Sequence, residues 1–229
     1  MSIADNLLKY KNELDQEQVQ LIAVSKYQET DAVLEAYHAG QRIFGENIVQ
    51  ELVDKQQQLP EDIEWHLIGH LQTNKVKYIA PFIKLIQSVD SLKLLIEINK
   101  QAIKHQRVID CLLQVYIADE DTKFGLGFDE LIELLRSDEL AALKNIRIVG
   151  LMGIASNNAS ERQTTDEFTE LKVLFDGIKL SFFRKEDSFK EVSMGMSGDY
   201  KLAIEAGSTM VRIGSSIFGK RKIKHYKAE

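Results

Sequence analysis

The sequence predicts an α/β fold in which eight parallel strands, each followed by a helix, close into a single (β/α)8 TIM barrel. Short apolar runs typical of strands alternate eight times with segments of helical periodicity. Parallel neighbours need a crossover connection, and eight such units in about 210 residues fall in the lower range for this barrel. With 229 residues, 44% of them hydrophobic, the chain suits one barrel domain over residues 1–229.

The predicted strands are short runs of β-branched and other apolar residues, bounded by glycine or polar residues. The first of them ends at Lys26, and the last two lead into turns rich in glycine and serine. In chain order, the strands are expected at residues 19–25, 42–45, 64–69, 82–89, 108–117, 146–152, 191–194 and 209–213.

The predicted helices fill the intervals between the strands. The opening helix has apolar residues from Ile3 to Leu14 at a spacing close to 3.6. Thr30 and Asp31 are expected to cap the second helix, and Gly40 to end it. In chain order, the helices are expected at residues 3–14, 30–39, 47–58, 74–79, 92–105, 129–143 as one or two helices, 160–183 and 199–206.

A doubly wound open sheet is the alternative arrangement of the same elements. That fold normally places its glycine-rich phosphate turn after the first strand. Here the first strand is followed by Lys26, and the glycine-rich turns come at the end of the chain. The barrel is therefore the favoured fold.

Charge and cysteine content narrow the range of partners. A net charge of −6 argues against general nucleic-acid binding, and the basic stretch 220–224 is interpreted as a solvated tail. The single cysteine, Cys111, lies in an apolar run and is expected to pack there, in a protein of a reducing compartment. No leader peptide or apolar run of membrane-spanning length is recognised. We therefore expect a cytoplasmic protein with neither membrane nor nucleic acid as a partner.

Two glycine-and-hydroxyl turns near the end of the chain predict a phosphate site. They cover residues 193–199 and 212–216, after the seventh and eighth strands. In a (β/α)8 barrel the turns after strands seven and eight commonly bind phosphate, because glycines let backbone N–H groups approach an anion. The sequence therefore predicts a phosphorylated small-molecule ligand.

Lys26 narrows the choice of ligand. It follows the first strand directly and is expected at the same mouth of the barrel as the two turns. A partly desolvated lysine amine can attack an aldehyde. A ligand that carries both an aldehyde and a phosphate is pyridoxal 5′-phosphate. A class I aldolase-like barrel, in which Lys26 attacks a sugar phosphate, is an alternative, as is a lysine that only pairs with a nearby carboxylate.

Six stretches, in order and at similar spacing, make the chain resemble the pyridoxal phosphate homeostasis protein family over almost its whole length. They cover residues 23–26, 36–40 leading into 44–51, 65–75, 150–155, 194–199 and 212–219. The resemblance implies a barrel of the type found in the N-terminal domain of alanine racemase, known as fold type III, which carries the cofactor as a lysine aldimine. Tyr27 departs from the family pattern, which commonly has threonine there.

The resemblance also implies roles for individual residues. Lys26 corresponds to the lysine that forms the aldimine, and Ser197 to a serine that contacts the phosphate. Gly214 and Ser215 correspond to the turn whose backbone N–H groups hold the phosphate. Arg212 corresponds to the arginine that faces the pyridine nitrogen in the related racemase barrel; a salt bridge at the barrel end is the alternative.

Three further polar residues allow more than one interpretation. Asn47, after the second strand, either bonds near the ring oxygen of the cofactor or caps the next helix. Glu46 is a candidate general base, but a glutamate beside a helix start is commonly a solvated charge. His66 is expected in the barrel interior, since its strand-type setting does not suit a zinc site with His70.

The implied function is intracellular homeostasis of pyridoxal phosphate, with no dedicated catalytic activity. A racemase of this architecture needs a second base from a further β-rich domain, for which the chain is expected to have no room. A racemase-like enzyme dependent on pyridoxal phosphate is the alternative function. Apo-enzymes that need the cofactor are the possible recipients, and a monomer is expected.

Overall fold

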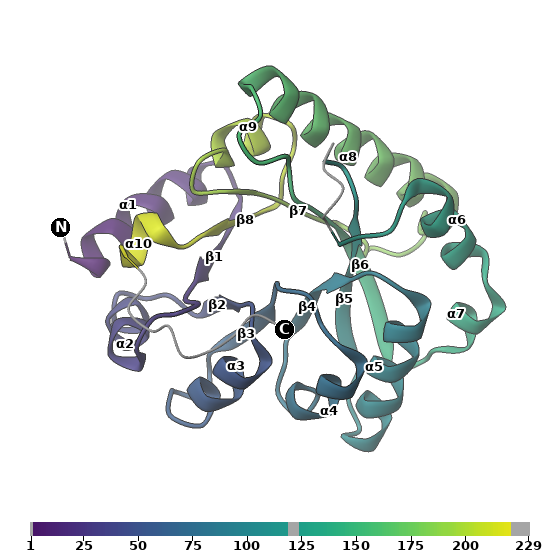
Figure 1. Cartoon of the computed structure of the whole chain (residues 1–229), viewed down its shortest axis with the longest axis horizontal. Helices are drawn as coiled ribbons and strands as arrows, with labels where there is room; N and C mark the ends of the chain where they lie inside the picture. Colours follow the sequence, from purple (N-terminus) through teal and green to yellow (C-terminus); the bar gives the residue numbers. More distant parts are fainter. Residues whose placement is uncertain (1, 119–123, 221–229) are drawn as a thin grey trace.

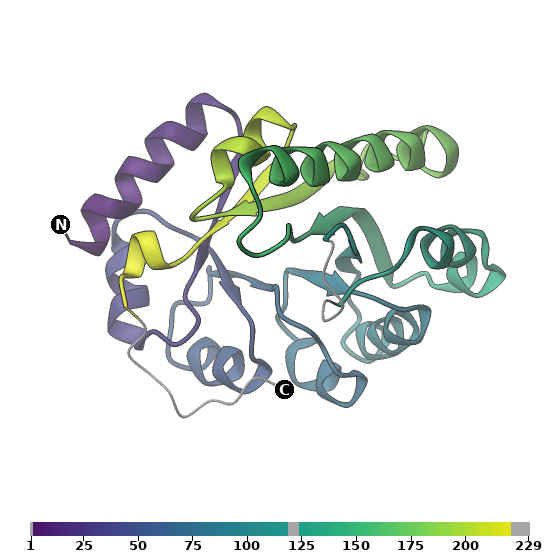
Figure 2. The same ribbon diagram turned by 45° about the horizontal axis from the view of Figure 1, so that its top comes forward.

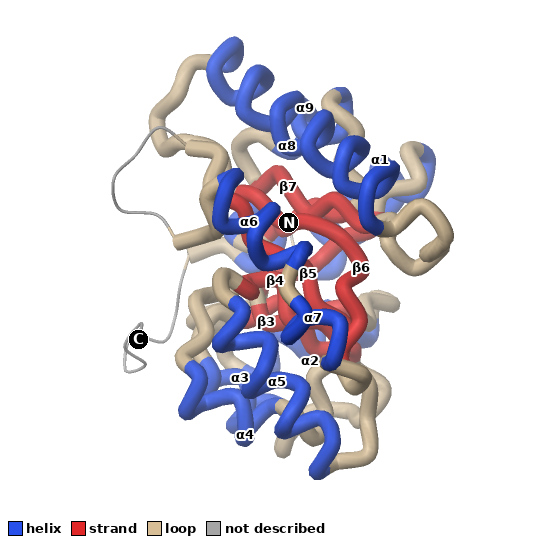
Figure 3. Tube along the Cα trace, turned by 90° about the vertical axis from the view of Figure 1, so that its right-hand side faces the viewer, coloured by secondary structure: helices blue, strands red, loops and turns tan. Residues whose placement is uncertain are grey.

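Eight parallel strands form a closed barrel in the computed structural model, which describes residues 2–118 and 124–220. Each strand pairs with the next along the chain, and β8 pairs with β1 to close the ring. Figures 1 and 3 show the strands gathered at the centre of the molecule. The predicted barrel is therefore confirmed. The strands are β1 (Gln20–Val24), β2 (Ile43–Glu46), β3 (Glu64–Leu67), β4 (Leu85–Val89), β5 (Ile109–Val115), β6 (Ile146–Gly153), β7 (Glu191–Met196) and β8 (Met210–Ile213).

The helices surround the strands (Figures 1 and 2), and the longest of them is α8. Most follow the predicted ranges, although their ends differ by a few residues. The predicted helix over 129–143 is two helices, α6 and α7. The helical segments are α1 (Ile3–Gln16), α2 (Thr30–His38), α3 (Val49–Gln56), the 3₁₀ turn η1 (Thr73–Lys75), α4 (Val76–Ile79), α5 (Leu92–Lys104), α6 (Phe128–Arg136), α7 (Asp138–Ala142), α8 (Glu161–Phe182), α9 (Tyr200–Glu205) and α10 (Ser215–Phe218).

Two expectations about helix ends are wrong. Thr30 and Asp31 do not cap α2, because the helix begins at Thr30 and its N-cap is Glu29, whose side chain makes no capping hydrogen bond. Ser215 and Ser216, predicted as part of the turn after the eighth strand, begin the short helix α10. By contrast, Gly40 ends α2 as predicted, at a φ of 93° that glycine tolerates without strain.

Apolar packing occurs in two layers separated by the sheet. The larger cluster joins outward-facing strand residues, such as Phe44 and Val211, to helix residues such as Leu7 and Phe168. The smaller cluster comes from strands alone, with Ile22, Leu85, Leu112, Val149, Met152 and Met210 as its buried members. This smaller cluster fills part of the barrel interior, as expected for a barrel of eight strands.

Cys111 packs in the outer apolar layer, as predicted. Burial raises the pKa of its thiol well above the usual range, which keeps it protonated. None of the helices in the described parts of the chain is long and apolar enough to cross a bilayer. The basic stretch 220–224 lies, apart from Lys220, outside the described residues.

Two glycines give a matched test of the packing between β6 and β7. A Cβ at Gly150 would lie 1.8 Å from the carbonyl oxygen of Glu191 on the neighbouring strand. At Gly177, within α8, a Cβ would meet no atom within 4 Å. Gly150→Ala is expected to lower the free energy of unfolding by about 3 kcal/mol or more, because the strands must separate. Gly177→Ala is expected to raise it by about 0.5–1 kcal/mol. Urea unfolding of both variants measures the difference, and equal midpoints would contradict this packing.

Candidate functional site

A cavity of about 290 Å³ opens at the carboxyl ends of β1, β2, β7 and β8. All six residues selected from the sequence line it: Lys26, Asn47, Ser197, Arg212, Gly214 and Ser215. They come from distant parts of the chain and meet because the strands are parallel and the sheet closes. The remaining lining residues are Val24, Gln28, Ile68, Ile154, Met196, Gly198 and Gly219.

The two glycine-and-hydroxyl turns lie side by side. The amide of Gly214, after β8, donates a 3.4 Å hydrogen bond to the hydroxyl oxygen of Ser197, after β7. The turn after β7 is closed by Asp199, whose carboxylate accepts from the amide of Met196 at 2.5 Å. The first amides of α10, at Ser215 and Ser216, have no partner within their helix, as at any helix start. Together these groups offer several N–H and O–H donors at one end of the cavity.

Gly214 brings this donor group beside the lysine. A Cβ at Gly214 would lie 2.9 Å from the carbonyl oxygen of Val24, the last residue of β1. Only glycine permits so close an approach without a backbone shift. Since Lys26 follows Val24 by two residues, the turn after β8 and the lysine after β1 face the same cavity.

The turn that contains Lys26 has an unusual backbone conformation. Tyr27 has a φ of 61°, which is uncommon for a residue with a side chain. Its amide donates a 2.6 Å hydrogen bond to the carboxylate of Glu51 in α3, and this bond fixes the conformation. The side chain of Lys26 is half-buried and lines the cavity.

A buried ionic cluster lies beneath this turn. The ammonium of Lys55 donates to Glu46, to Glu51 and to the backbone carbonyl of Ser25, each at 2.7 Å. The hydroxyl of Ser25 also donates to Glu46, at 2.6 Å. Both carboxylates are fully buried, and Lys55 is 3% exposed. The cluster therefore ties β2 and α3 to the residues on either side of Lys26.

The structure corrects both interpretations of Glu46 made from the sequence. It is the last residue of β2, is fully buried, and is neither a solvated charge beside a helix nor a residue that lines the cavity. Burial raises the pKa of Glu46 to about 7; the nearby Glu51 adds to the rise, while Lys55 opposes it. Because a single lysine lies between two buried carboxylates, the cluster favours a proton on Glu46.

Two amide side chains present acceptors that have no hydrogen-bond partner within the described chain. The Oδ1 of Asn47 and the Oε1 of Gln28 are both buried without one, and both residues line the cavity. The alternative role of Asn47 as a helix cap is wrong, because the N-cap of α3 is Ile48. An unsatisfied buried acceptor is costly, so a ligand with a donor near these oxygens would be stabilised. Sequence reasoning did not identify Gln28.

Arg212 is a strand residue that points into the barrel. Its guanidinium donates to the hydroxyl of Ser193 at 2.6 Å and to the carbonyl of Gly153 at 2.9 Å. The alternative of a salt bridge at the barrel end is wrong, since no ion pair of Arg212 occurs among the described residues. Burial lowers the pKa of Arg212 to about 10, with Asp199 opposing the shift, so it remains charged at neutral pH.

The two histidines four residues apart have separate surroundings. His66 is buried in the barrel interior, as predicted, and bonds Gln87 at 3.0 Å. His70 bonds Asp90 at 3.1 Å and stacks on Phe124. Within the described residues, no group of three or more potential metal ligands converges.

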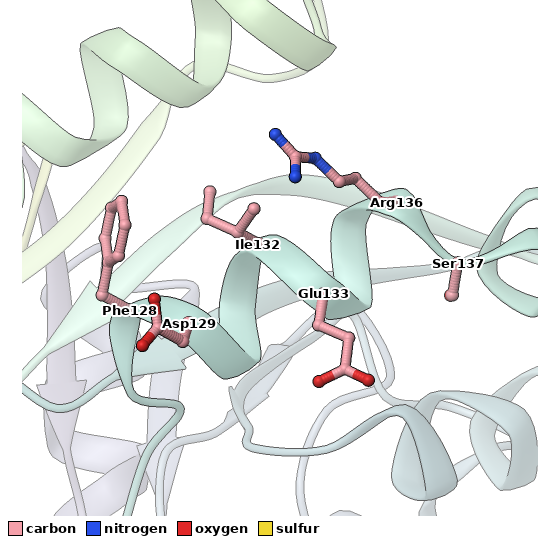
Figure 4. Close-up of a pocket in the computed structure, with 6 residues that line it drawn as sticks. All are labelled: Phe128, Asp129, Ile132, Glu133, Arg136 and Ser137. Carbon is pink, nitrogen blue, oxygen red and sulfur yellow. The ribbon is translucent and has the colours of Figure 1, made fainter.

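A larger hollow, of about 770 Å³, runs along α6 on the outer surface (Figure 4). Figure 4 shows Phe128, Ile132 and Arg136 on one side of this helix and Glu133 pointing to the other. Because the lining residues all come from one helix and its end, their polar groups do not converge on a point. The cavity at the strand ends, with groups from several elements, is therefore the candidate site.

Known proteins resemble this chain in both sequence and fold. Residues 1–222 match the family described as alanine racemase, N-terminal domain. A pyridoxal phosphate homeostasis protein of Vibrio alginolyticus is 40% identical over 210 residues, covering 90% of this chain and 88% of that protein. One from Schizosaccharomyces pombe is 39% identical over 205 residues, covering 89% and 84% of the respective chains.

Solved structures agree with these sequence matches. PipY of Synechococcus elongatus, with pyridoxal phosphate bound, has a TM-score of 0.86 at 36% identity, and the match covers 95% of this chain and 100% of PipY. An alanine racemase of Bartonella henselae, at 18% identity and a TM-score of 0.69, shares the fold; the match covers 100% of this chain and 62% of the racemase.

The proton held by Glu46 predicts a pH dependence of stability. Its pKa is raised in the folded protein from 4.5 to about 7, so between these values the folded state binds more protons than the unfolded state. Stability is therefore expected to fall as the pH rises through this interval, by on the order of 1 to 3 kcal/mol. Glu46→Gln, which is neutral at every pH, is expected to remove this part of the dependence. Glu64→Gln, at a half-exposed position, is the matched control and should retain it.

Denaturant unfolding at several pH values between 4.5 and 8 measures the effect. A Glu46→Gln variant whose stability falls with pH as steeply as that of the unmodified chain would contradict the assignment of the proton to this cluster.

Proposed function

We propose that this chain, which belongs to the family of pyridoxal phosphate homeostasis proteins that share the alanine racemase N-terminal domain, binds pyridoxal 5′-phosphate in the cavity at the strand ends. The observation that carries the proposal is the placement of a lysine amine and a group of anion-binding donors at one cavity. The cofactor supplies an aldehyde and a phosphate, and the cavity has one group suited to each.

Lys26 provides the amine. Its side chain lines the cavity, and its backbone is fixed by the bonds of Ser25 and Tyr27 to the buried ionic cluster. A lysine amine bonds an aldehyde carbon with loss of water, and a fixed, partly buried position favours this chemistry. We propose Lys26 as the covalent attachment point.

The turns after β7 and β8 provide the phosphate site. Ser197 offers a hydroxyl, and Gly214, Ser215 and their neighbours offer backbone N–H groups beside it. Gly198 has open space around it, with no atom within 4 Å of an added Cβ. These turns suit a phosphate in size and in the type of donor they present.

The rest of the cavity suits an aromatic ring with polar substituents. Ile68, Ile154 and Met196 supply apolar surface. Asn47 Oδ1 is a buried acceptor that a ring hydroxyl would satisfy. Arg212 supplies N–H donors, which suit the unprotonated nitrogen of a pyridine ring because an arginine gives up its proton only with difficulty.

We propose a holding role in cofactor homeostasis, without dedicated catalysis. Among the described residues that line the cavity, the titratable side chains are Lys26 and Arg212. Racemization requires a second proton-transfer group opposite the lysine, so this lining supports holding the cofactor over racemization. Transfer to apo-enzymes is part of the proposal. A cytoplasmic location is part of the proposal and is supported by the single cysteine, which has no second cysteine to pair with.

Lys26→Ala tests the attachment point. Purified protein mixed with pyridoxal phosphate is expected to gain the visible absorption of the covalently bound cofactor and to keep it through gel filtration. Lys26→Ala is expected to lose this absorption, because no lysine amine then remains among the described residues that line the cavity. Lys100→Ala, an exposed surface lysine, is the control and should behave like the unmodified chain. Retention of the absorption in Lys26→Ala would overturn the assignment.

Gly198→Asp tests the phosphate site. A carboxylate added beside the two turns is expected to weaken binding of pyridoxal phosphate about tenfold or more, because it repels the phosphate. Gly198→Asn has the same size without the charge and is the matched control. Pyridoxal, which lacks the phosphate, should bind both variants equally. Titration of the two ligands into the two variants measures the effect, and equal weakening for pyridoxal would place the phosphate elsewhere.

A further inference from the structure

A chain of hydrogen bonds crosses the barrel interior from Arg212 to His66. Arg212 donates to the Oγ of Ser193 at 2.6 Å, Ser193 bonds Gln87 Oε1 at 2.6 Å, and Gln87 bonds His66 Nδ1 at 3.0 Å. The four residues belong to β8, β7, β4 and β3. All are buried, with Gln87 and Ser193 fully so.

Arginine determines the direction of every bond in this chain. A guanidinium can only donate, so the oxygen of Ser193 accepts from Arg212 and its single proton goes to Gln87. The atom of Gln87 that faces Ser193 must then be the carbonyl oxygen, which leaves its amide group to donate to His66. Nδ1 of His66 therefore accepts, and the ring is neutral with its proton on Nε2. Burial lowers the pKa of His66 to about 3, which agrees with a neutral ring.

The chain connects two hollows at opposite ends of the barrel. Arg212 lines the cavity at the carboxyl ends of the strands. His66 lines a second hollow, of about 330 Å³, which includes Gln20, Glu64 and Arg147 from the opposite strand ends. The charged groups there pair with one another, as Arg147 does with Asp110 at 2.7 Å. Lys84 likewise pairs with Glu64 at 3.8 Å and Lys190 with Glu191 at 3.9 Å, so each charged side chain among the described residues that line this hollow has a partner of opposite charge.

The pairing of the strands is irregular around Gln87 and Ser193, the two middle residues of this chain of hydrogen bonds. The pairing of β4 with β5 shifts register between Ile86 and Val89, around Gln87. The pairing of β7 with β8 shifts between Ser193 and Met196. Such irregularities redirect side chains, and both occur at the two residues that connect Arg212 to His66.

We propose that Gln87 and Ser193 are positioning residues for Arg212, with His66 as the terminal acceptor. This inference rests on the proposed function, since Arg212 is taken to face the ring nitrogen of pyridoxal phosphate. The bonds to Ser193 and Gly153 use one N–H of each terminal nitrogen of the guanidinium, so further N–H donors remain on Arg212, which lines the cavity. These bonds also place oxygen atoms on a buried positive charge to which no carboxylate of the described residues is bonded. Arg212 thus stays charged and oriented before any ligand binds.

Two ligands that differ only at the ring nitrogen measure how well Arg212 is positioned. Pyridoxal phosphate is compared with its analogue in which C–H replaces the ring nitrogen; this analogue keeps the aldehyde and the phosphate. A hydrogen bond from a charged donor predicts that the unmodified chain prefers the nitrogen-containing ligand by about tenfold or more. Gln87→Met and Ser193→Ala are expected to reduce this preference to about threefold or less, because the donor is no longer held in place. Ser193→Thr, which keeps the hydroxyl, should restore most of it.

The ratio of the two affinities separates positioning from a general structural effect. A loosened cavity weakens both ligands alike and leaves their ratio unchanged. Gln114→Met is the matched control, since Gln114 is a buried glutamine of β5 that bonds the carbonyl of Phe124 instead of the chain to Arg212. Gln114→Met should keep the preference for the nitrogen-containing ligand. The proposal is overturned if Gln87→Met and Ser193→Ala also keep it, or if the unmodified chain shows no preference.

A measurement without ligand completes the test. The ring ¹⁵N spectrum of His66 in the free protein should show a neutral ring with its proton on Nε2 between pH 5 and 8, with Nδ1 perturbed by an accepted hydrogen bond. Gln87→Met should abolish that perturbation. A charged His66, or a proton on Nδ1, overturns the proposal whatever the ligands do. If neither ligand binds while this spectrum is as expected, the proposed cofactor function has failed, and with it the role assigned to Arg212. The spectrum would then still show that the hydrogen bond between Gln87 and His66 is formed.

Discussion

Closure of the sheet is the constraint on which the site depends. The pairing of β8 with β1 places residues almost two hundred positions apart on neighbouring strands, with Gln20 opposite Met210 and Ala23 opposite Ile213. Gly214 then passes so close to Val24 that a side chain is excluded. As a result, Lys26 and the turn after β8 share one cavity. An open sheet would leave these two groups at opposite edges.

Two buried polar networks hold the groups that this closure brings together. One consists of Lys55, Glu46 and Glu51, and it fixes the backbone on both sides of Lys26. The other runs from Arg212 through Ser193 to Gln87. Burying charges and polar groups is expensive, and hydrophobic replacements are often at least as stable. We interpret both networks as devices that orient the cavity groups, at some cost in stability.

The two networks differ in how their buried charge is compensated. The cluster below Lys26 has two carboxylates for one ammonium, and its excess charge is relieved by a raised pKa at Glu46. The chain behind Arg212 has a cation surrounded by neutral acceptors, and Arg212 keeps its charge because its pKa remains near 10. The cavity is therefore lined by a lysine on a turn tied to buried groups and by an arginine that does not readily release its proton. This combination supports the proposed retention of a cofactor over carbanion chemistry on it.

Local patterns in the sequence determined the fold and the position of the main candidate site residues. Alternation of strand and helix periods identifies the eight strands, and the turns after β1, β7 and β8 identify Lys26, Ser197 and Gly214, because periodicity and turn chemistry are local properties. Tertiary structure alone decided the supporting contacts. Glu51 and Lys55 look from their spacing like an exposed helical pair, yet packing of α3 against β2 buries both. Gln87 and Ser193 are 106 residues apart, and nothing local to either indicates that they meet. Such contacts depend on which side of each strand faces the interior and on register shifts between neighbouring strands, and both are set only when the barrel closes.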